Sequence, residues 1–177
     1  MNQTVTTVFN LCFLIQALGQ IEGRLKLGKI IYLLEETGCY LGFSFENSHC
    51  GPWPSELPAA LDWLETNGYI TRKEVETEGY AGLIYQPVEK PPMPIDRFFP
   101  HHLKYGDLSR QLEILKSAPA GVLILASMRR YHLNKGLSPR RVRKILAECL
   151  YYEERYNRPA QKLLRDLGLN RNPSPRV

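Results

Sequence analysis

Apolar residues in the first half of the chain recur at three- and four-residue spacing, the pattern of helices with one buried face. Two such stretches predict helices over about 4–18 and 25–37. A third helix follows Pro52 and Pro54, which cannot continue a helix or occupy a central strand. We expect Ser55 to cap this helix and Gly68 to end it.

Alternation of apolar and polar residues predicts β-structure on both sides of the third helix. Residues 39–49 suggest a short strand before it, and residues 69–75 and 83–88 predict a hairpin with a glycine-bearing loop after it. Two helices, a third helix and then a hairpin is the order of elements in a winged helix-turn-helix domain. We therefore predict such a domain over residues 1–89.

A proline-rich linker, residues 90–94, separates this domain from a second half with helical periodicity. Ser138-Pro139 is a capping residue followed by proline at the first helical position. The predicted fold class is mainly α with a small β-hairpin: a winged helix-turn-helix domain followed by a basic helical extension, residues 95–170, and a tail, residues 171–177. The helices expected in the extension cover about 107–117, 119–134, 138–152 and 158–167.

Charge divides the chain at the linker. Residues 1–96 carry 12 Asp or Glu against 6 Lys or Arg, a net −6, whereas residues 97–177 carry 6 against 17, a net +11. Such asymmetry indicates two surfaces with different partners. We expect the first half to contact a protein and the second half to contact nucleic acid, DNA or RNA.

The candidate protein-binding residues lie at the third helix. Its solvent side carries Glu56, Asp62 and Glu65 and no Lys or Arg, so it is poorly suited to phosphates. Trp53 precedes the helix and is either a core anchor beside the prolines or, if exposed, the aromatic centre of an acidic-rimmed contact surface.

The candidate nucleic-acid-binding residues are two clusters of cations in the second half. Four of them lie in the first turns of a helix, where positive charge opposes the helix dipole. They form either a solvated face or a contact with a polyanionic partner, and we expect the partner. The other cluster ends a helix, where cations are favoured, and this makes a purely structural role the stronger alternative for it. The residues are Arg140, Arg141, Arg143 and Lys144, and Arg129 and Arg130.

The sequence offers no catalytic motif, and we expect a non-enzymatic protein. The pairs His49-Cys50 and His101-His102 lack a third ligand at metal-binding spacing, so no metal or cofactor is expected. The four cysteines form no Cys-x-x-Cys motif and are predicted to be reduced thiols in a cytoplasmic protein. No apolar run approaches the roughly 18 residues that would span a bilayer, so no membrane partner is expected.

Three stretches of the first half resemble a known family. They are residues 22–38, which contain Lys29-Ile-Ile-Tyr32, the Gly51-Pro52 helix start, and residues 64–70. They resemble the YwgA family and, more distantly, the Panacea (SocA-like) antitoxin domain. The resemblance covers about residues 8–88. It implies a winged-helix fold and, for the antitoxin branch, binding to a toxin or protease component rather than catalysis.

Together these patterns predict a regulatory, possibly antitoxin-like, binding protein that joins a protein partner to nucleic acid. A protein–protein adaptor whose basic helices meet an acidic partner remains an alternative, as does an enzyme whose site is assembled from scattered residues. Homodimerisation is also left open.

Overall fold

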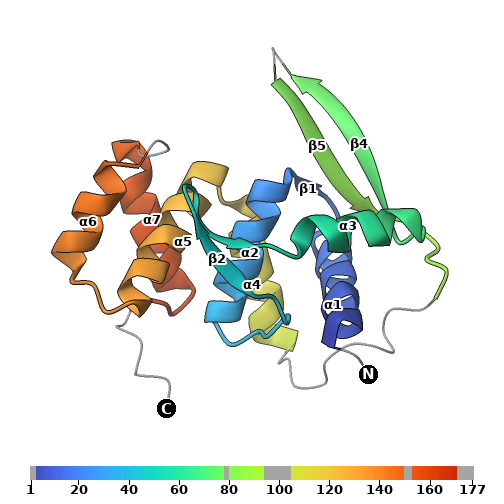
Figure 1. Cartoon of the computed structure of the whole chain (residues 1–177), viewed down its shortest axis with the longest axis horizontal. Helices are drawn as coiled ribbons and strands as arrows, with labels where there is room; N and C mark the ends of the chain where they lie inside the picture. The colour runs from blue at the N-terminus through green and yellow to red at the C-terminus, as the bar shows by residue number, and fades with distance from the viewer. Residues whose placement is uncertain (1–2, 78–79, 94–104, 150–152, 171–177) are drawn as a thin grey trace.

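The protein is mostly helical and carries two small antiparallel sheets (Figure 1). The computed structural model describes residues 3–77, 80–93, 105–149 and 153–170. Within this part of the chain the helices are α1 (Gln3–Leu18), α2 (Arg24–Glu36), α3 (Leu57–Thr66), α4 (Tyr105–Ser117), α5 (Ala120–Asn134), α6 (Pro139–Ala147) and α7 (Glu154–Asp166). The strands are β1 (Ile21–Glu22), β2 (Phe45–Ser48), β3 (Gly51–Pro54), β4 (Ile70–Thr77) and β5 (Tyr80–Pro87).

The larger sheet has the strand order β1-β5-β4, and all its pairs are antiparallel. The predicted hairpin is confirmed as β4 and β5, which project away from the helices (Figure 1). The short β1 lies between α1 and α2 and pairs with β5, so that Ile21 lies opposite Tyr85. This pairing fastens the base of the hairpin to the first two helices.

The smaller sheet is the hairpin of β2 and β3, with Asn47 opposite Pro52. Pro52 and Pro54 fit here because each strand of a two-stranded sheet is an edge strand. The expected Ser55 cap is wrong: α3 begins at Leu57, its cap position is Glu56, and no side chain caps it. The Ser55 hydroxyl lies 3.3 Å from the Glu56 carboxylate instead.

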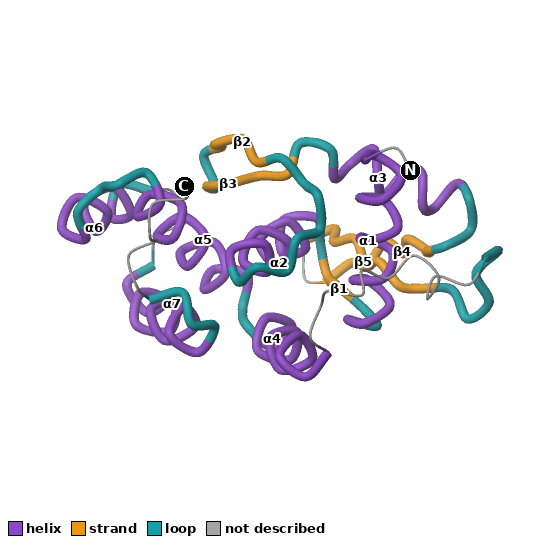
Figure 2. Tube along the Cα trace, turned by 90° about the horizontal axis from the view of Figure 1, so that it is seen from below, coloured by secondary structure: helices purple, strands orange, loops and turns teal. Residues whose placement is uncertain are grey.

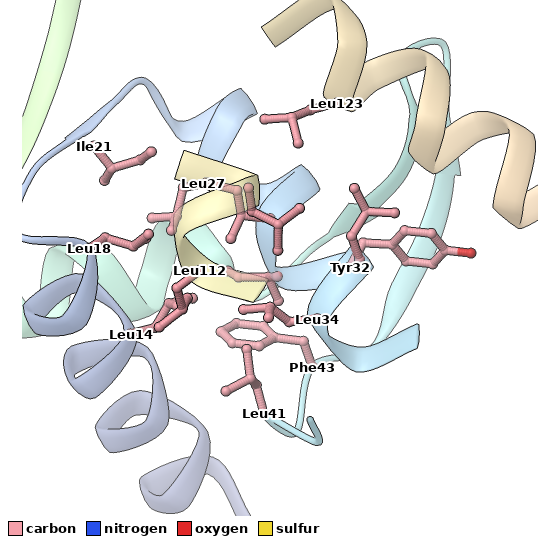
Figure 3. Close-up of a cluster of buried hydrophobic side chains, with 14 of the residues drawn as sticks. Leu14, Leu18, Ile21, Leu27, Tyr32, Leu34, Leu41, Phe43, Leu112 and Leu123 are labelled. Carbon is pink, nitrogen blue, oxygen red and sulfur yellow. The ribbon is translucent and has the colours of Figure 1, made fainter. Parts of the chain in front are cut away.

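One buried cluster of apolar side chains joins the two halves of the chain. Leu14 of α1, Leu34 of α2, Leu112 of α4 and Leu123 of α5 all belong to it, and Figure 3 shows them converging. Helix α5 packs against α2 and β3, and α7 in turn packs against α5 (Figure 2). The basic second half is therefore held on the first half by a shared core.

The helices of the second half begin close to their predicted positions, with one exception. The cap at Ser138 is confirmed, because its hydroxyl accepts the backbone N–H of Arg141 at 3.4 Å. Helix α7 starts at Glu154, earlier than the predicted 158, and contains Pro159 in its interior. The end of the predicted linker at residue 94 and the tail 171–177 lie outside the described residues, and residues 90–93 are in neither helix nor strand.

Candidate nucleic-acid interface

A groove of about 830 Å³ is lined by residues of α5, α6 and α7. Helices α6 and α7 lie at the end of the molecule opposite the β4–β5 hairpin (Figure 1). Five arginines line the groove, and we call it the arginine groove. Helix α5 contributes one of them, and α6 and α7 contribute two each. The full lining is Arg129, Pro139, Arg140, Arg143, Glu154, Arg155, Asn157, Arg158 and Gln161.

Two arginines of α6 line the groove because the apolar residues of the helix face the core. Val142 and Leu146 are buried, one turn apart, and fix which face of the helix meets the core. Arg140 and Arg143 are three residues apart and so share a second face, where both are exposed. The Ser138 cap and Pro139 at the first helical position define where this short helix begins.

Helix α7 forms the opposite wall by the same logic. Its buried residues are Ala160, Leu163 and Leu164. Arg155 and Arg158 are again three residues apart and exposed. The ring of Tyr156 packs against Gly121 of α5 so closely that a Cβ at that glycine would lie 2.5 Å from the ring. This close contact sets the position of α7, and with it the width of the groove.

Arg129 supplies the contribution of α5 and is held by polar side chains. Its guanidinium donates to Oδ1 of Asn157 at 3.0 Å, and the same oxygen accepts from Nε2 of Gln161 at 3.2 Å. The interaction ties α5 to α7 across the groove. Arg129 is thus both a structural link and part of the cationic lining.

The positive charge of the groove is only partly neutralised within the chain. Arg155 pairs with Glu153 at 2.6 Å and lies over the ring of Tyr156, 4.8 Å from its centroid. Among the described residues, no carboxylate lies within 4.0 Å of a side-chain nitrogen of Arg140, Arg143 or Arg158. An unneutralised set of this kind favours an external anion.

The six predicted nucleic-acid-binding residues do not stay together. Arg129, Arg140 and Arg143 line the groove, whereas Arg141 and Lys144 are exposed on α6 outside it. Arg130 is on the opposite side of α5, buried against α2. It is 8% exposed, pairs with Glu36 of α2 at 2.8 Å and donates to the carbonyl oxygen of Leu169 at 3.2 Å.

Arg130 is therefore removed from the candidate interface, because a buried arginine that already has a carboxylate and a carbonyl as partners cannot reach phosphate. Two arginines of the groove, Arg155 and Arg158, are not among the six predicted residues; from the sequence they were expected only as an extension of the two clusters. Arg155 and Arg158 are three residues apart, on the face of α7 opposite its apolar residues. This pattern requires a helix that begins at Glu154, and the sequence predicted a start at residue 158.

The four predicted protein-binding residues lie around α3 and are less available than expected. Trp53 is half-buried, and its ring packs on Gly28 of α2, where an added Cβ would lie 2.9 Å away. Asp62 and Glu65 share Arg72 of β4, at 3.7 and 3.3 Å. Glu56 is exposed.

The exposed aromatic on α3 is Trp63 rather than Trp53. Trp63 is 43% exposed and stacks on Tyr69 with ring centroids 5.8 Å apart. Its position was available from the sequence, because Trp63 falls outside the apolar stripe that places Leu61 and Leu64 in the core. An aromatic beside Asp62 retains the character of the predicted contact surface, displaced onto the helix itself.

A second cavity, of about 880 Å³, lies between the start of α2, the β2–β3 turn and β5. Its lining includes Arg24, His49, Cys50 and Trp53. Among the described residues no three His, Cys, Asp or Glu side chains come together in a metal-binding arrangement. The cavity is more apolar than the arginine groove and contains no comparable concentration of charge.

Lys29 is a fully buried cation, and it is held by the β2–β3 hairpin. Its Nζ donates to the carbonyl oxygen of Pro52 at 2.6 Å. Burial lowers the pKa of Lys29 to about 8, against the opposing influence of the Cys50 and Cys149 thiols. The lysine therefore joins α2 to β3, and no carboxylate in the described part of the chain pairs with it.

All four cysteines are free; Cys12, Cys39 and Cys50 are buried, and Cys149 is half-buried. None of the helices in the described ranges is long and apolar enough to cross a membrane. No family model, curated protein or solved structure matches this chain.

Proposed function

We propose that the protein is a non-catalytic regulatory binding protein whose arginine groove contacts nucleic acid. The observation that carries the proposal is the convergence of five arginines from three helices on one groove, three of them without a carboxylate partner in the described chain. Placing like charges together destabilises a folded protein, and phosphates would relieve the repulsion. Phosphate contacts by arginine supply most of the sequence-independent affinity for nucleic acids.

The first half would then supply the regulatory contact with another protein. The order α1, β1, α2, α3, β4, β5 and the strand order β1-β5-β4 support a winged-helix domain with the β2–β3 hairpin inserted before α3. The solvent side of α3 carries Glu56, Asp62 and Glu65, which would repel a DNA backbone. Exposed Trp63 in this acidic setting suits a basic protein segment, in keeping with an antitoxin-like regulator.

The test is binding of the full chain to a fluorescently labelled mixed-sequence oligonucleotide, followed by anisotropy during a NaCl titration. We expect affinity that falls steeply with salt, because binding releases counterions. Arg140→Glu combined with Arg143→Glu should lower affinity at least tenfold.

The matched control is Arg110→Glu combined with Lys116→Glu, which makes the same change in net charge at exposed positions of α4. If both pairs weaken binding equally, the effect belongs to the net charge and the groove is not the site. Absence of binding at low salt would leave the protein–protein adaptor as the better function.

A further inference from the structure

We propose that the arginine groove takes a single-stranded phosphodiester chain and excludes a duplex; this rests on the proposed function. The first argument is shape. Arginines of both α6 and α7 line the same groove, so a ligand in the groove meets guanidinium donors from two helices. A duplex presents its phosphates on the outside of a thick rod, and proteins read it with an element that enters a groove of the DNA.

The size of the site supports the same assignment. At about 830 Å³ the arginine groove falls within the range of small-ligand pockets, roughly 300–1,000 Å³. A site of this volume accommodates a short stretch of a single chain. Arg140 and Arg143 on one wall and Arg158 on the other can then contact successive phosphates from both sides.

The groove also contains groups that suit unpaired bases. Proteins that bind single strands combine a cationic groove with flat side chains on which bases stack. The Arg155 guanidinium lies over the Tyr156 ring, 4.8 Å from its centroid, and the side chain is exposed, so this planar group is available for a base to stack on. Asn157 Oδ1 and Gln161 Nε2 are used in the contact with Arg129, which leaves Nδ2 of Asn157 and Oε1 of Gln161 to bond base edges.

The surfaces that could receive a duplex are less suitable. Helix α3, the equivalent of a recognition helix in a winged-helix domain, exposes Asp62 and no cation. The face of α6 outside the groove carries Arg141 and Lys144, two exposed cations on one short helix. This face is the competing site, and it provides a matched pair of variants for the test.

The experiment compares labelled 12-nucleotide single-stranded RNA and DNA of one mixed sequence with the corresponding duplexes, using the full chain at 50 and 200 mM NaCl. We expect either single strand to bind at least tenfold more tightly than its duplex. If three to five phosphates are contacted, the slope of log K against log salt should lie between about −2 and −3.5. Competition by inorganic polyphosphate separates a pure charge effect from base stacking.

Two double variants assign the site. Arg140→Glu with Arg143→Glu should abolish single-strand binding, whereas Arg141→Glu with Lys144→Glu, on the same helix and with the same change of charge, should weaken it less than threefold. Circular dichroism and thermal unfolding confirm that each variant is folded, and Arg158→Glu provides a second groove variant on α7.

The outcomes are distinguishable. A duplex that binds as tightly as the single strand, or greater sensitivity to the Arg141 and Lys144 pair, overturns the single-strand assignment and leaves nucleic-acid binding intact. Polyphosphate that displaces the strand at equal phosphate concentration removes the stacking contribution and also overturns it. No binding of any oligonucleotide at 50 mM NaCl overturns both the assignment and the proposed function.

Discussion

Two neighbouring arginines of α5 have opposite surroundings. Arg130 is buried against α2, where the Glu36 carboxylate accepts a hydrogen bond from its guanidinium at 2.8 Å. The same carboxylate accepts a second hydrogen bond from the Asn134 side-chain amide at 2.7 Å. We call these three residues the Glu36 network. Arg129 lines the arginine groove, beside Arg140, Arg143 and Arg158, which have no carboxylate within 4.0 Å among the described residues.

The difference lies in where the compensating charge comes from. In the Glu36 network the chain supplies both charges, and the buried Tyr32 hydroxyl bonds to the same carboxylate, where burial and Glu36 raise the pKa of the tyrosine. In the groove the chain supplies mainly one sign. A charge in the Glu36 network supports the fold, and a charge in the arginine groove is available for a partner. Substitutions in the network should therefore change the free energy of unfolding, and substitutions in the groove should change the affinity for oligonucleotides.

The largest effect on stability is expected from Arg130→Met. It leaves the Glu36 carboxylate buried without its cation, which should lower the free energy of unfolding by about 3–5 kcal/mol. Urea denaturation measures this change. Arg143→Met, in the groove, is the control and should change stability by less than about 0.5 kcal/mol.

A second variant protects this prediction from a trivial explanation. Combining Arg130→Met with Glu36→Gln removes both charges and should recover much of the loss, because no unpaired charge stays buried and the amide oxygen can still accept from the Tyr32 hydroxyl and the Asn134 amide. If the double variant is as unstable as the single one, the packing around α2 and α5 rather than the ion pair determines the effect.

The next effect concerns the groove. Neutralising Arg140→Gln and Arg143→Gln removes two charged hydrogen bonds to phosphate and should weaken oligonucleotide binding by about 2–3 kcal/mol, with unfolding changed by less than about 0.5 kcal/mol. Anisotropy and urea denaturation on the same samples provide both values. Equal losses in the two measurements would contradict the division between the regions.

Lys29 is the counterpart of Arg130, because it is a buried cation that has no carboxylate partner among the described residues. Its pKa is about 8 in the folded chain against an ordinary 10.5, so between these pH values the unfolded chain holds a proton that the folded chain does not. The free energy of unfolding should therefore rise with pH through this window, by about 1 kcal/mol per unit. Below pH 8 the amine is charged in both states and the full cost of burial is present.

The measurement is urea unfolding of the protein and of Lys29→Met at pH 7.5, 8.5 and 9.5. The variant has no amine to titrate, so the difference in stability between the two proteins should change with pH. A constant difference over this range would show that Lys29 keeps its ordinary pKa and that water reaches its ammonium group.

The sequence predicted the mainly helical character and the β-hairpin better than it predicted the site, for physical reasons. The β4–β5 hairpin and the Ser138 cap followed from local rules that need no tertiary information. Helix α5 gave no such guidance. It is buried over most of its circumference, so periodicity could not tell which of Arg129 and Arg130 faces inward.

Proline and tryptophan caused the remaining errors. Pro159 suggested that α7 begins beside it, because proline favours the first turn, yet packing of Tyr156 and Ala160 on α5 extends the helix back to Glu154. The sequence left Trp53 as either a core anchor or an exposed contact residue; its ring packs half-buried on Gly28, and the exposed tryptophan is Trp63 of α3. Both corrections depend on contacts with another helix, which local patterns do not contain.

The smallest effect is expected at the acidic surface of α3, where the chain again supplies its own counter-charge. Arg72→Ala removes the partner of Asp62 and Glu65, but these are exposed ion pairs, and the free energy of unfolding should fall by less than about 1 kcal/mol. Thermal unfolding at 20 and 500 mM NaCl measures the change and its screening by salt. Oligonucleotide affinity should stay within twofold, because Arg72 lies on β4, far from the arginine groove (Figure 1). A loss of binding comparable to that of the groove variants would mean that nucleic acid extends over the first half, and the division of the molecule into two contact surfaces would then be wrong.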